Sequence, residues 1–260
     1  MEERVLLSAS HLCKKFRLDR KNIIYAVRDV SLDIYRGETL ALVGESGCGK
    51  STLARLLLRI IKADEGSVRF EGRDITGLSE KALLPYRKEM QMVFQDPASS
   101  LDPRMRIRDI IAEPLETWRV YDDRRKIDDR ITELLEMVEL NEDCLDRYPH
   151  QFSGGQKQRI GIARAIAAEP KLIVCDESVS ALDVCVQAQI LNLLKRLKDR
   201  LKLTCLFISH DLSVVSFIAD RVCVMKNGAI CEMDAAEKIY ASPEHEYTKY
   251  LLSSIPKLIL

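Results

Sequence analysis

A glycine-rich loop between a short apolar run and a helical pattern constrains this chain more than any other feature. The apolar run covers residues 39–43, and the loop reads Gly44-Glu45-Ser46-Gly47-Cys48-Gly49-Lys50-Ser51. After the loop, apolar residues recur at helical spacing, at Leu53, Leu56, Leu57, Ile60 and Ile61. A strand, a glycine loop and a helix in this order form the context of a phosphate-binding loop. A purely structural glycine turn is the alternative, and the flanking strand and helix argue against it.

The residues of the loop have the chemistry to bind the phosphates of a nucleoside triphosphate. The three glycines let backbone amides crowd around the β- and γ-phosphates, and the positive end of the following helix adds to the attraction. Lys50 supplies a point charge, and Ser51 supplies a hydroxyl ligand for Mg²⁺. The loop therefore predicts a nucleoside triphosphate and Mg²⁺ as cofactors.

A pair of acidic residues ends a second apolar run, at residues 172–175. Asp176 is predicted to lie at the carboxyl edge of a buried strand, where α/β sheets bind ligands, and it can hold Mg²⁺ through water. Glu177 follows it and could polarise the attacking water as a general base. Two acids after a strand are a weak pattern by themselves, and this pair gains its weight from Lys50.

The remaining patterns predict an α/β fold with a parallel core and an antiparallel fringe. Strands are predicted at residues 30–34, 39–43, 68–70, 91–94, 172–175 and 204–208. Helices are predicted at about residues 156–168 and 190–201. The stretch from Pro97 to His150 has helical periodicity without strand patterns, which indicates a helical insertion. A hairpin is predicted at residues 222–232, because Asn227-Gly228 accepts the positive φ angles of a tight turn.

Composition excludes several classes of function. The 260 residues include 40 basic and 40 acidic side chains, so the net charge is zero and no concentrated basic surface for nucleic acid is predicted. No apolar run approaches the roughly 18 residues needed to cross a bilayer, and the start of the chain lacks a signal-peptide pattern. We therefore expect a cytoplasmic protein. The eight scattered cysteines include no Cys-x-x-Cys pair, and most of them are expected to behave as small core residues.

Four further segments occur in the order found in ATP-binding cassette (ABC) ATPases. Phe152-Ser153-Gly154-Gly155-Gln156 resembles the signature motif of that family, and Gln95 follows a strand as its glutamine loop does. Ser180-Ala181-Leu182-Asp183 is similar to the aspartate loop, and His210 is similar to the switch histidine. The resemblance covers residues 10 to 232. It implies one P-loop NTPase domain over residues 1–260, with a RecA-like core, a helical subdomain at about 97–165, an antiparallel β fringe and a tail at about 233–260.

The resemblance also implies roles for individual residues. The nucleotide-binding set would be Phe16, Gly44, Ser46, Gly47, Gly49, Lys50, Ser51, Thr52, Ser153, Gly154, Gly155 and Gln156. The signature residues among them would reach the γ-phosphate held by a second subunit. The magnesium ligands would be Ser51, Gln95 and Asp176. Glu177, Gln95 and His210 would form the catalytic set, with His210 orienting the γ-phosphate. Phe16 would stack on adenine, with Tyr25 as a competitor, and for Tyr25 ordinary packing is the favoured interpretation.

Three segments resemble the peptide and nickel importer branch of the family: residues 95–104, 147–151 and 243–256. This branch implies an ATPase that powers uptake of dipeptides, oligopeptides or metal chelates from the cytoplasmic face of the membrane. Its partners would be a second ATPase subunit arranged head to tail, two permease subunits and an extracytoplasmic substrate-binding protein. One departure is Ser178, where most members have proline.

Two other classes of ABC protein are alternatives to an importer. A soluble accessory subunit of an enzyme complex, such as carbon–phosphorus lyase, resembles the same branch. DNA-repair and translation proteins generally have a long coiled coil or two cassettes, and this chain has neither. The resemblance leaves open the cargo and the choice between a homodimer and a heterodimer.

Overall fold

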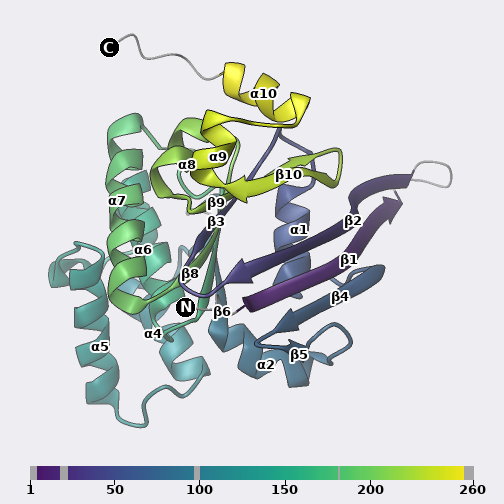
Figure 1. Cartoon of the computed structure of the whole chain (residues 1–260). Coiled ribbons are helices and arrows are strands. Elements are labelled where there is room, and N and C mark those ends of the chain that lie inside the picture. The colour runs from purple at the N-terminus through teal and green to yellow at the C-terminus, as the bar shows by residue number, and fades with distance from the viewer. Residues whose placement is uncertain (1–4, 18–22, 97–99, 181, 255–260) are drawn as a thin grey trace. The chain divides into compact units, whose positions relative to one another are not determined.

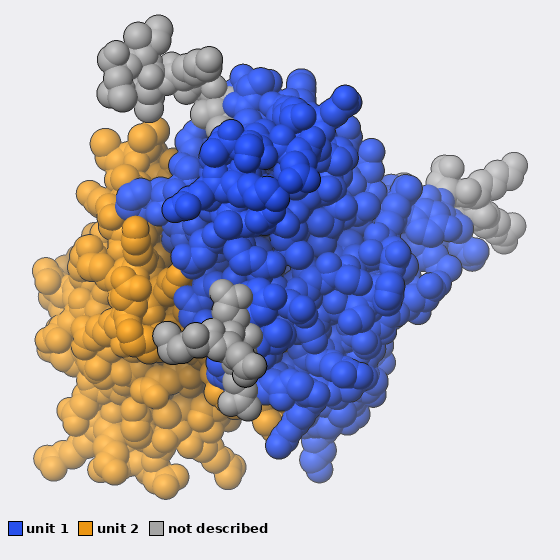
Figure 2. Space-filling model, in the orientation of Figure 1, with its two compact units in different colours: residues 1–84, 204–260 blue, residues 85–203 orange. Residues whose placement is uncertain are grey.

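The computed structural model describes residues 5–17, 23–96, 100–180 and 182–254. The chain forms two compact units, which Figure 2 colours separately. One unit contains residues 1–84 and 204–260, and the other contains residues 85–203. In sequence, the second unit is therefore an insertion in the first.

The first unit starts with an antiparallel sheet whose strands lie in the order β2-β1-β4-β5 (Figure 1). The bounds are Val5–Arg17 for β1, Ile23–Tyr35 for β2, Glu65–Phe70 for β4 and Arg73–Asp74 for β5. The sequence predicted only parts of β2 and β4, and it missed β1. His11 and Asp29 have positive φ angles of 53° and 50°, and register shifts interrupt the β1–β2 pairing. These irregularities break the alternation by which a strand is recognised.

A second group of strands in the same unit carries the glycine loop. The bounds are Thr39–Val43 for β3, Thr204–Ser209 for β8, Arg221–Lys226 for β9 and Ala229–Ala235 for β10. β3 pairs in parallel with β8 and β9, and β10 returns antiparallel to β9. The predicted hairpin is confirmed: Asn227 and Gly228 form its turn with φ angles of 49° and 85°. All five residues of β3 are buried, as its uninterrupted apolar pattern predicted.

The helices of the first unit are short. The bounds are Lys50–Leu57 for α1, Leu212–Ile218 for α8, Ala236–Ala241 for α9 and Glu246–Ser253 for α10. α2 (Glu80–Glu89) contains residues of both units. The prediction that the helix after the loop extends to Ile60 and Ile61 is wrong. Arg59 has a φ of 55° and its buried Nε donates to the carbonyl of Ile75 at 3.0 Å, which turns the chain away from the helix and leaves Ile60 exposed.

In its described residues, the second unit combines the parallel strand pair β6 and β7 with the helices α4, α5, α6 and α7. The bounds are Met90–Val93 for β6, Leu172–Asp176 for β7, Ile107–Thr117 for α4, Arg124–Met137 for α5, Gly154–Ile166 for α6 and Val184–Leu201 for α7. Two 3₁₀ turns lie at Glu142–Cys144 and Pro149–Gln151. α6 contacts α4, α5 and α7.

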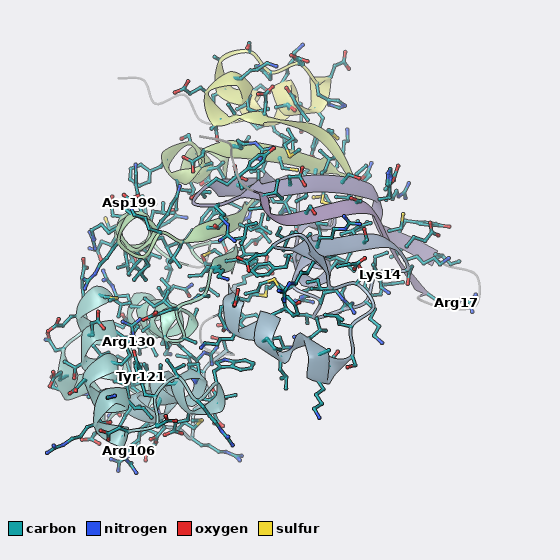
Figure 3. The ribbon with its side chains drawn as sticks, turned by 60° about the horizontal axis from the view of Figure 1, so that its bottom comes forward. Lys14, Arg17, Arg106, Tyr121, Arg130 and Asp199 are labelled. Atoms are coloured by element: carbon teal, nitrogen blue, oxygen red, sulfur yellow. The ribbon has the colours of Figure 1, made fainter. Side chains whose placement is uncertain are left out.

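The helical periodicity of residues 97–150 is matched by the secondary structure of the described part, while a separate helical subdomain at about 97–165 stays a prediction. The described residues between 100 and 150 form helices and turns and contain no strand, while residues 97–99 lie outside the described part. Arg159 fixes α6 to the end of α5, because its buried guanidinium donates to the carbonyl of Val138 at 2.8 Å and pairs with Glu139. Arg130 on α5 (Figure 3) pairs with Glu133 and Glu169.

Among the residues that the structure describes, none of the helices combines the length and the apolar character needed to span a membrane. All eight cysteines are free thiols. Cys175, Cys205 and Cys223 are buried within strands, as predicted for small core residues.

Candidate nucleotide-binding site

The glycine loop connects the buried end of β3 to the start of α1. Gly49 is the residue before the helix, with a φ of 109°, and as a glycine it has no side chain to cap α1. The amides at a helix start are the groups that an anion binds, and the helix dipole favours negative charge there. Glu45, Ser46 and Gly47 are exposed, and Ser51 and Thr52 are half-buried. The loop is therefore open to a ligand at Glu45, Ser46 and Gly47.

Two glycines of the loop are required by packing within the unit. A Cβ atom on Gly44 would lie 2.2 Å from the carbonyl oxygen of Met225, and one on Gly49 would lie 2.1 Å from that of Ala26. Both glycines also have positive φ angles, of 151° and 109°. Sequence reasoning assigned these glycines to the approach of phosphate alone. The structure adds that the loop is pressed against β2 and β9, which fixes its shape.

Lys50 is buried inside the loop. Its Nζ donates to the carbonyl of Gly44 at 2.8 Å and to that of Glu45 at 2.9 Å. The ammonium group is thereby held over the loop, where the approach of a phosphate would give it a stronger, charged acceptor. Cys48 is also buried, and burial raises the pKa of its thiol, so the thiol stays protonated in the neutral range.

In the second unit, Gln95 and Glu177 follow the neighbouring parallel strands β6 and β7, and their side chains are hydrogen-bonded. Asp176 is the last residue of β7 and is buried, and Glu177 follows it with a φ of 45°. The side-chain amide of Gln95, just after β6, donates to Oε2 of Glu177 at 3.0 Å. Ser180 supports the turn, because its N–H and Oγ donate to the carbonyl of Glu177 at 3.1 and 2.9 Å. A positive φ at glutamate is a local strain of the kind that gathers at functional sites.

The signature residues form the start of α6. Ser153 caps this helix: its Oγ accepts from the N–H of Gln156 at 3.3 Å, and its N–H donates to Oε1 of Gln156 at 3.0 Å. Ser153, Gly154 and Gln156 are exposed, whereas Gly155 is buried. A Cβ on Gly155 would lie 2.4 Å from Cγ1 of Val186 on α7. The helix start is thus accessible while its second glycine is needed for helix packing.

The two remaining loop motifs lie at helix starts. His210 is exposed just after β8, and the next residue, Asp211, caps α8 by accepting from the N–H of Ser213 at 2.8 Å. In the predicted aspartate loop, Asp183 caps α7 by accepting from the N–H of Val186 at 3.0 Å, and Ala181 lies outside the described residues. These capping roles were not predicted, although an aspartate before an apolar helical pattern indicates one.

The two aromatic candidates for adenine are both accessible. Phe16 is 41% exposed with Lys14 Nζ 5.6 Å from its ring centroid, and Tyr25 is 49% exposed with the guanidinium of Arg28 at 5.4 Å. Lys14 lies on β1 (Figure 3). An open hollow of about 410 Å³ is lined by Cys13, Lys14, Lys15, Tyr25, Arg28, Asp29, Asp64 and Glu65. Stacking of adenine on Phe16 stays a prediction.

A match to a protein-family model identifies the family of this chain. The family model described as ABC transporter matches residues 27–180, more than half of the chain. The chain belongs to the ABC transporter family. The match contains the glycine loop, the signature residues and the acidic pair, so this ABC protein is a nucleotide-binding ATPase that hydrolyses ATP.

Full-length relatives agree with that assignment. The oligopeptide transport ATP-binding protein OppF of Bacillus subtilis (strain 168) is 51% identical over 252 residues, covering 96% of this chain and 82% of the relative. The dipeptide transport ATP-binding protein DppF of Lactococcus lactis subsp. cremoris (strain MG1363) is 49% identical over 257 residues, covering 98% and 82%.

A solved structure supports the fold of this ABC ATPase. The ATP-binding cassette MJ0796, in a dimeric post-hydrolysis state with ADP and Pi, superposes with a TM-score of 0.81 at 30% identity, covering 89% of this chain and 99% of that chain. The predicted fold class is confirmed.

One contact of the ABC ATPase was missed by sequence reasoning. Tyr247 on α10, in the tail that was predicted only as a branch feature, accepts a hydrogen bond from the N–H of Glu45 in the glycine loop at 3.2 Å. No local pattern could have found it, because the two residues are 202 positions apart. The other tail prediction, Pro256, lies outside the described residues.

Proposed function

We propose that this ABC ATPase powers the import of oligopeptides or dipeptides through partner permeases. The observation that carries the proposal is the identity of about half of all residues, over nearly the whole chain, with ATP-binding proteins of oligopeptide and dipeptide transport. The segments at residues 95–104 and 147–151, which resemble the peptide and nickel branch, support the same conclusion. The names of these relatives favour peptides over nickel as the cargo, and they give no support to an accessory role in a lyase complex.

For nucleotide binding, the proposed residues are those of the glycine loop, with Phe16 under adenine. The amides from Ser46 to Thr52 and the ammonium of Lys50 would hold the β- and γ-phosphates. Lys50 would exchange its two carbonyl acceptors in the loop for phosphate oxygens, which carry a full charge.

The donor set suits magnesium. A hydroxyl from Ser51, a carboxylate from Asp176 and an amide oxygen from Gln95 are hard oxygen ligands of the kind that Mg²⁺ prefers. When bound, Mg²⁺ neutralises charge on the phosphates. These three residues are the proposed ligands, directly or through water.

For hydrolysis, Glu177 is the proposed general base. Its carboxylate accepts a proton from the attacking water, and the amide of Gln95 holds that carboxylate by its bond to Oε2. The backbone turn with positive φ, held by Ser180, sets the direction of the glutamate side chain. His210 is proposed to orient the γ-phosphate by donating a hydrogen bond to it.

We further propose a head-to-tail dimer in which each ATP lies between two subunits. The exposed start of α6, with Ser153, Gly154, Gly155 and Gln156, would contact the γ-phosphate bound to the glycine loop of the other subunit. The structure of MJ0796, a bacterial ABC transporter cassette, is dimeric, which supports a dimer of ATPase subunits. Two permease subunits and an extracytoplasmic substrate-binding protein complete the proposed assembly. In it, the ATPase would lie at the cytoplasmic face of the membrane. Residues 1–260 are proposed to form a single ABC ATPase domain.

Purification from the native cell tests this function. The tagged chain, extracted from membranes in mild detergent, should copurify with permease subunits, a second ATPase subunit and a peptide-binding protein. Recovery in a soluble complex without any permease would contradict import. The copurified ATPase subunit also distinguishes a homodimer from a heterodimer.

A further inference from the structure

The carboxyl-terminal helix contacts the glycine loop through one side chain. Tyr247, on the first turn of α10, is only 4% exposed. The backbone N–H of Glu45 donates to its hydroxyl oxygen at 3.2 Å. Glu45 is the second residue of the loop, directly before the exposed Ser46 and Gly47. The contact therefore lies at the edge of the segment that is proposed to bind phosphate.

Several interactions fix Tyr247 relative to the β9–β10 hairpin. The carboxylate of Glu232 on β10 accepts from the N–H groups of Glu244 and His245 at 2.8 and 3.1 Å, which anchors the start of α10. Nδ1 of His245 then accepts from the N–H of Tyr247 at 3.0 Å. Lys226, the last residue of β9, places its Nζ 4.4 Å from the centroid of the tyrosine ring. The tyrosine is thus held from both its backbone and its ring.

The same hairpin also holds the other end of the loop. The N–H of Gly228 donates to the carbonyl of Cys48 at 2.9 Å. Within the loop, the carbonyl of Glu45 accepts from Lys50 Nζ at 2.9 Å and from the N–H of Cys48 at 3.3 Å. Both polar groups of the Glu45 backbone are therefore bonded, and the partner of its N–H is Tyr247.

We propose that Tyr247 is a positioning residue that holds the glycine loop in the arrangement that binds nucleotide. This inference rests on the proposed role of the loop as the nucleotide site. A partly buried N–H that loses its acceptor is destabilised, so without the tyrosine hydroxyl the loop would populate other arrangements. The apparent dissociation constant for nucleotide then equals the intrinsic one divided by the fraction of molecules whose loop is in the binding arrangement. Burial raises the pKa of Tyr247, so the phenol is neutral and keeps this role across the neutral pH range.

The test variant is Tyr247→Phe in the full chain, which removes one oxygen and retains the ring under Lys226. The dissociation constants of Mg·ADP and Mg·ATP, measured by calorimetric titration, should rise roughly three- to tenfold, the scale of one lost hydrogen bond. In the assembled transporter, KM for ATP should rise by a similar factor while kcat stays within about twofold of wild type, because Tyr247 does not touch the reacting atoms. Hydrogen exchange at the Glu45 amide should become faster.

Tyr240→Phe is the matched control. The hydroxyl of Tyr240, in the same tail segment, donates to the carbonyl of Leu212 at 2.6 Å and does not reach the loop. This variant should lose thermal stability to a similar extent and bind Mg·ADP with wild-type affinity. Leu212 lies two residues after His210, which is proposed to orient the γ-phosphate. ADP is therefore the probe for this control, because it has no γ-phosphate.

Lys50→Ala separates the two ways in which the idea could fail. If Lys50→Ala abolishes binding and Tyr247→Phe binds both nucleotides with wild-type affinity, the loop is the site and the positioning role of Tyr247 is wrong. If Lys50→Ala binds Mg·ADP normally, the proposed nucleotide site itself is wrong and the inference falls with it. Weaker binding in Tyr247→Phe alone, with Tyr240→Phe unchanged, supports the positioning role.

Discussion

Replacing Gly49 by alanine introduces one methyl group where the glycine loop has no room for it. The added Cβ would lie 2.1 Å from the carbonyl oxygen of Ala26 and 2.9 Å from the methyl of Met225. The methionine end can move, but the carbonyl belongs to β2 and can shift only with its strand. The φ of Gly49 is 109°, which alanine also disfavours.

The size of the effect follows from these two terms. A positive φ at a residue with a Cβ costs about 1–2 kcal/mol. Overpacking against a backbone atom adds about 1–3 kcal/mol. The lower entropy of the unfolded alanine chain offsets about 0.4–1 kcal/mol. The net loss in the free energy of unfolding is therefore about 1–5 kcal/mol, which corresponds to a fall in Tm of roughly 2–20 °C for a chain of this size.

The control is Gly37→Ala, at a turn with a φ of 76° and nothing within 4 Å of the added Cβ. That variant carries the backbone and unfolded-chain terms without the steric one, so its net loss is about 0–1.6 kcal/mol and its Tm should fall by roughly 0–6 °C, less than that of Gly49→Ala. Thermal unfolding followed by circular dichroism measures both variants. Equal losses at Gly37 and Gly49 would refute the argument that close packing against β2 requires the loop glycine.

The other predictions concern the proposed dimer, the loop thiol and residues 95–104, which the resemblance to the importer branch implies would dock the permease subunits. Mixing Lys50→Ala with Ser153→Arg chains should give dimers with at most one intact site, and each variant alone should be inactive. Normal ATPase activity of Ser153→Arg in the transporter would contradict a shared site. Arg104→Glu should weaken copurification of permeases and leave ATP binding by the isolated subunit unchanged, while unchanged copurification would remove residues 95–104 from docking. Iodoacetamide should modify the exposed Cys185 before Cys48, because burial raises the pKa of the Cys48 thiol and delays its reaction until the pH exceeds the ordinary thiol range. Mass spectrometry after timed quenching gives the order of modification, and modification of Cys48 first would contradict this prediction.

Local patterns sufficed for the parts of the fold whose cause is local. β3 is an uninterrupted buried run with its predicted bounds, and Asn227-Gly228 specifies a hairpin turn by its own backbone preferences. β1 escaped detection because its pairing with β2 contains irregularities that a period-two pattern does not describe. The end of α1 was misplaced because Arg59 is turned by a bond to Ile75, a residue outside the helix.

The candidate site divides in the same way. Lys50, Asp176 and Glu177 were predicted because each directly follows a loop or strand with a recognisable pattern. The bond between Gln95 and Glu177 and the bond between Glu45 and Tyr247 join residues 82 and 202 positions apart. Contacts of this kind depend on how the elements pack, and a single sequence carries no periodicity that reports them.

The central claim is that this chain hydrolyses ATP to drive peptide import, with Glu177 as the base. The direct measurement is uptake of a labelled oligopeptide into liposomes that contain the copurified transporter, with ATP on the side of the ATPase subunits and the peptide-binding protein on the other. Wild type should accumulate peptide only with ATP. Glu177→Gln should bind ATP normally while uptake and turnover fall about 100-fold or more, the scale of a lost general base. Uptake by Glu177→Gln at the wild-type rate, or equal uptake without ATP, would contradict the account.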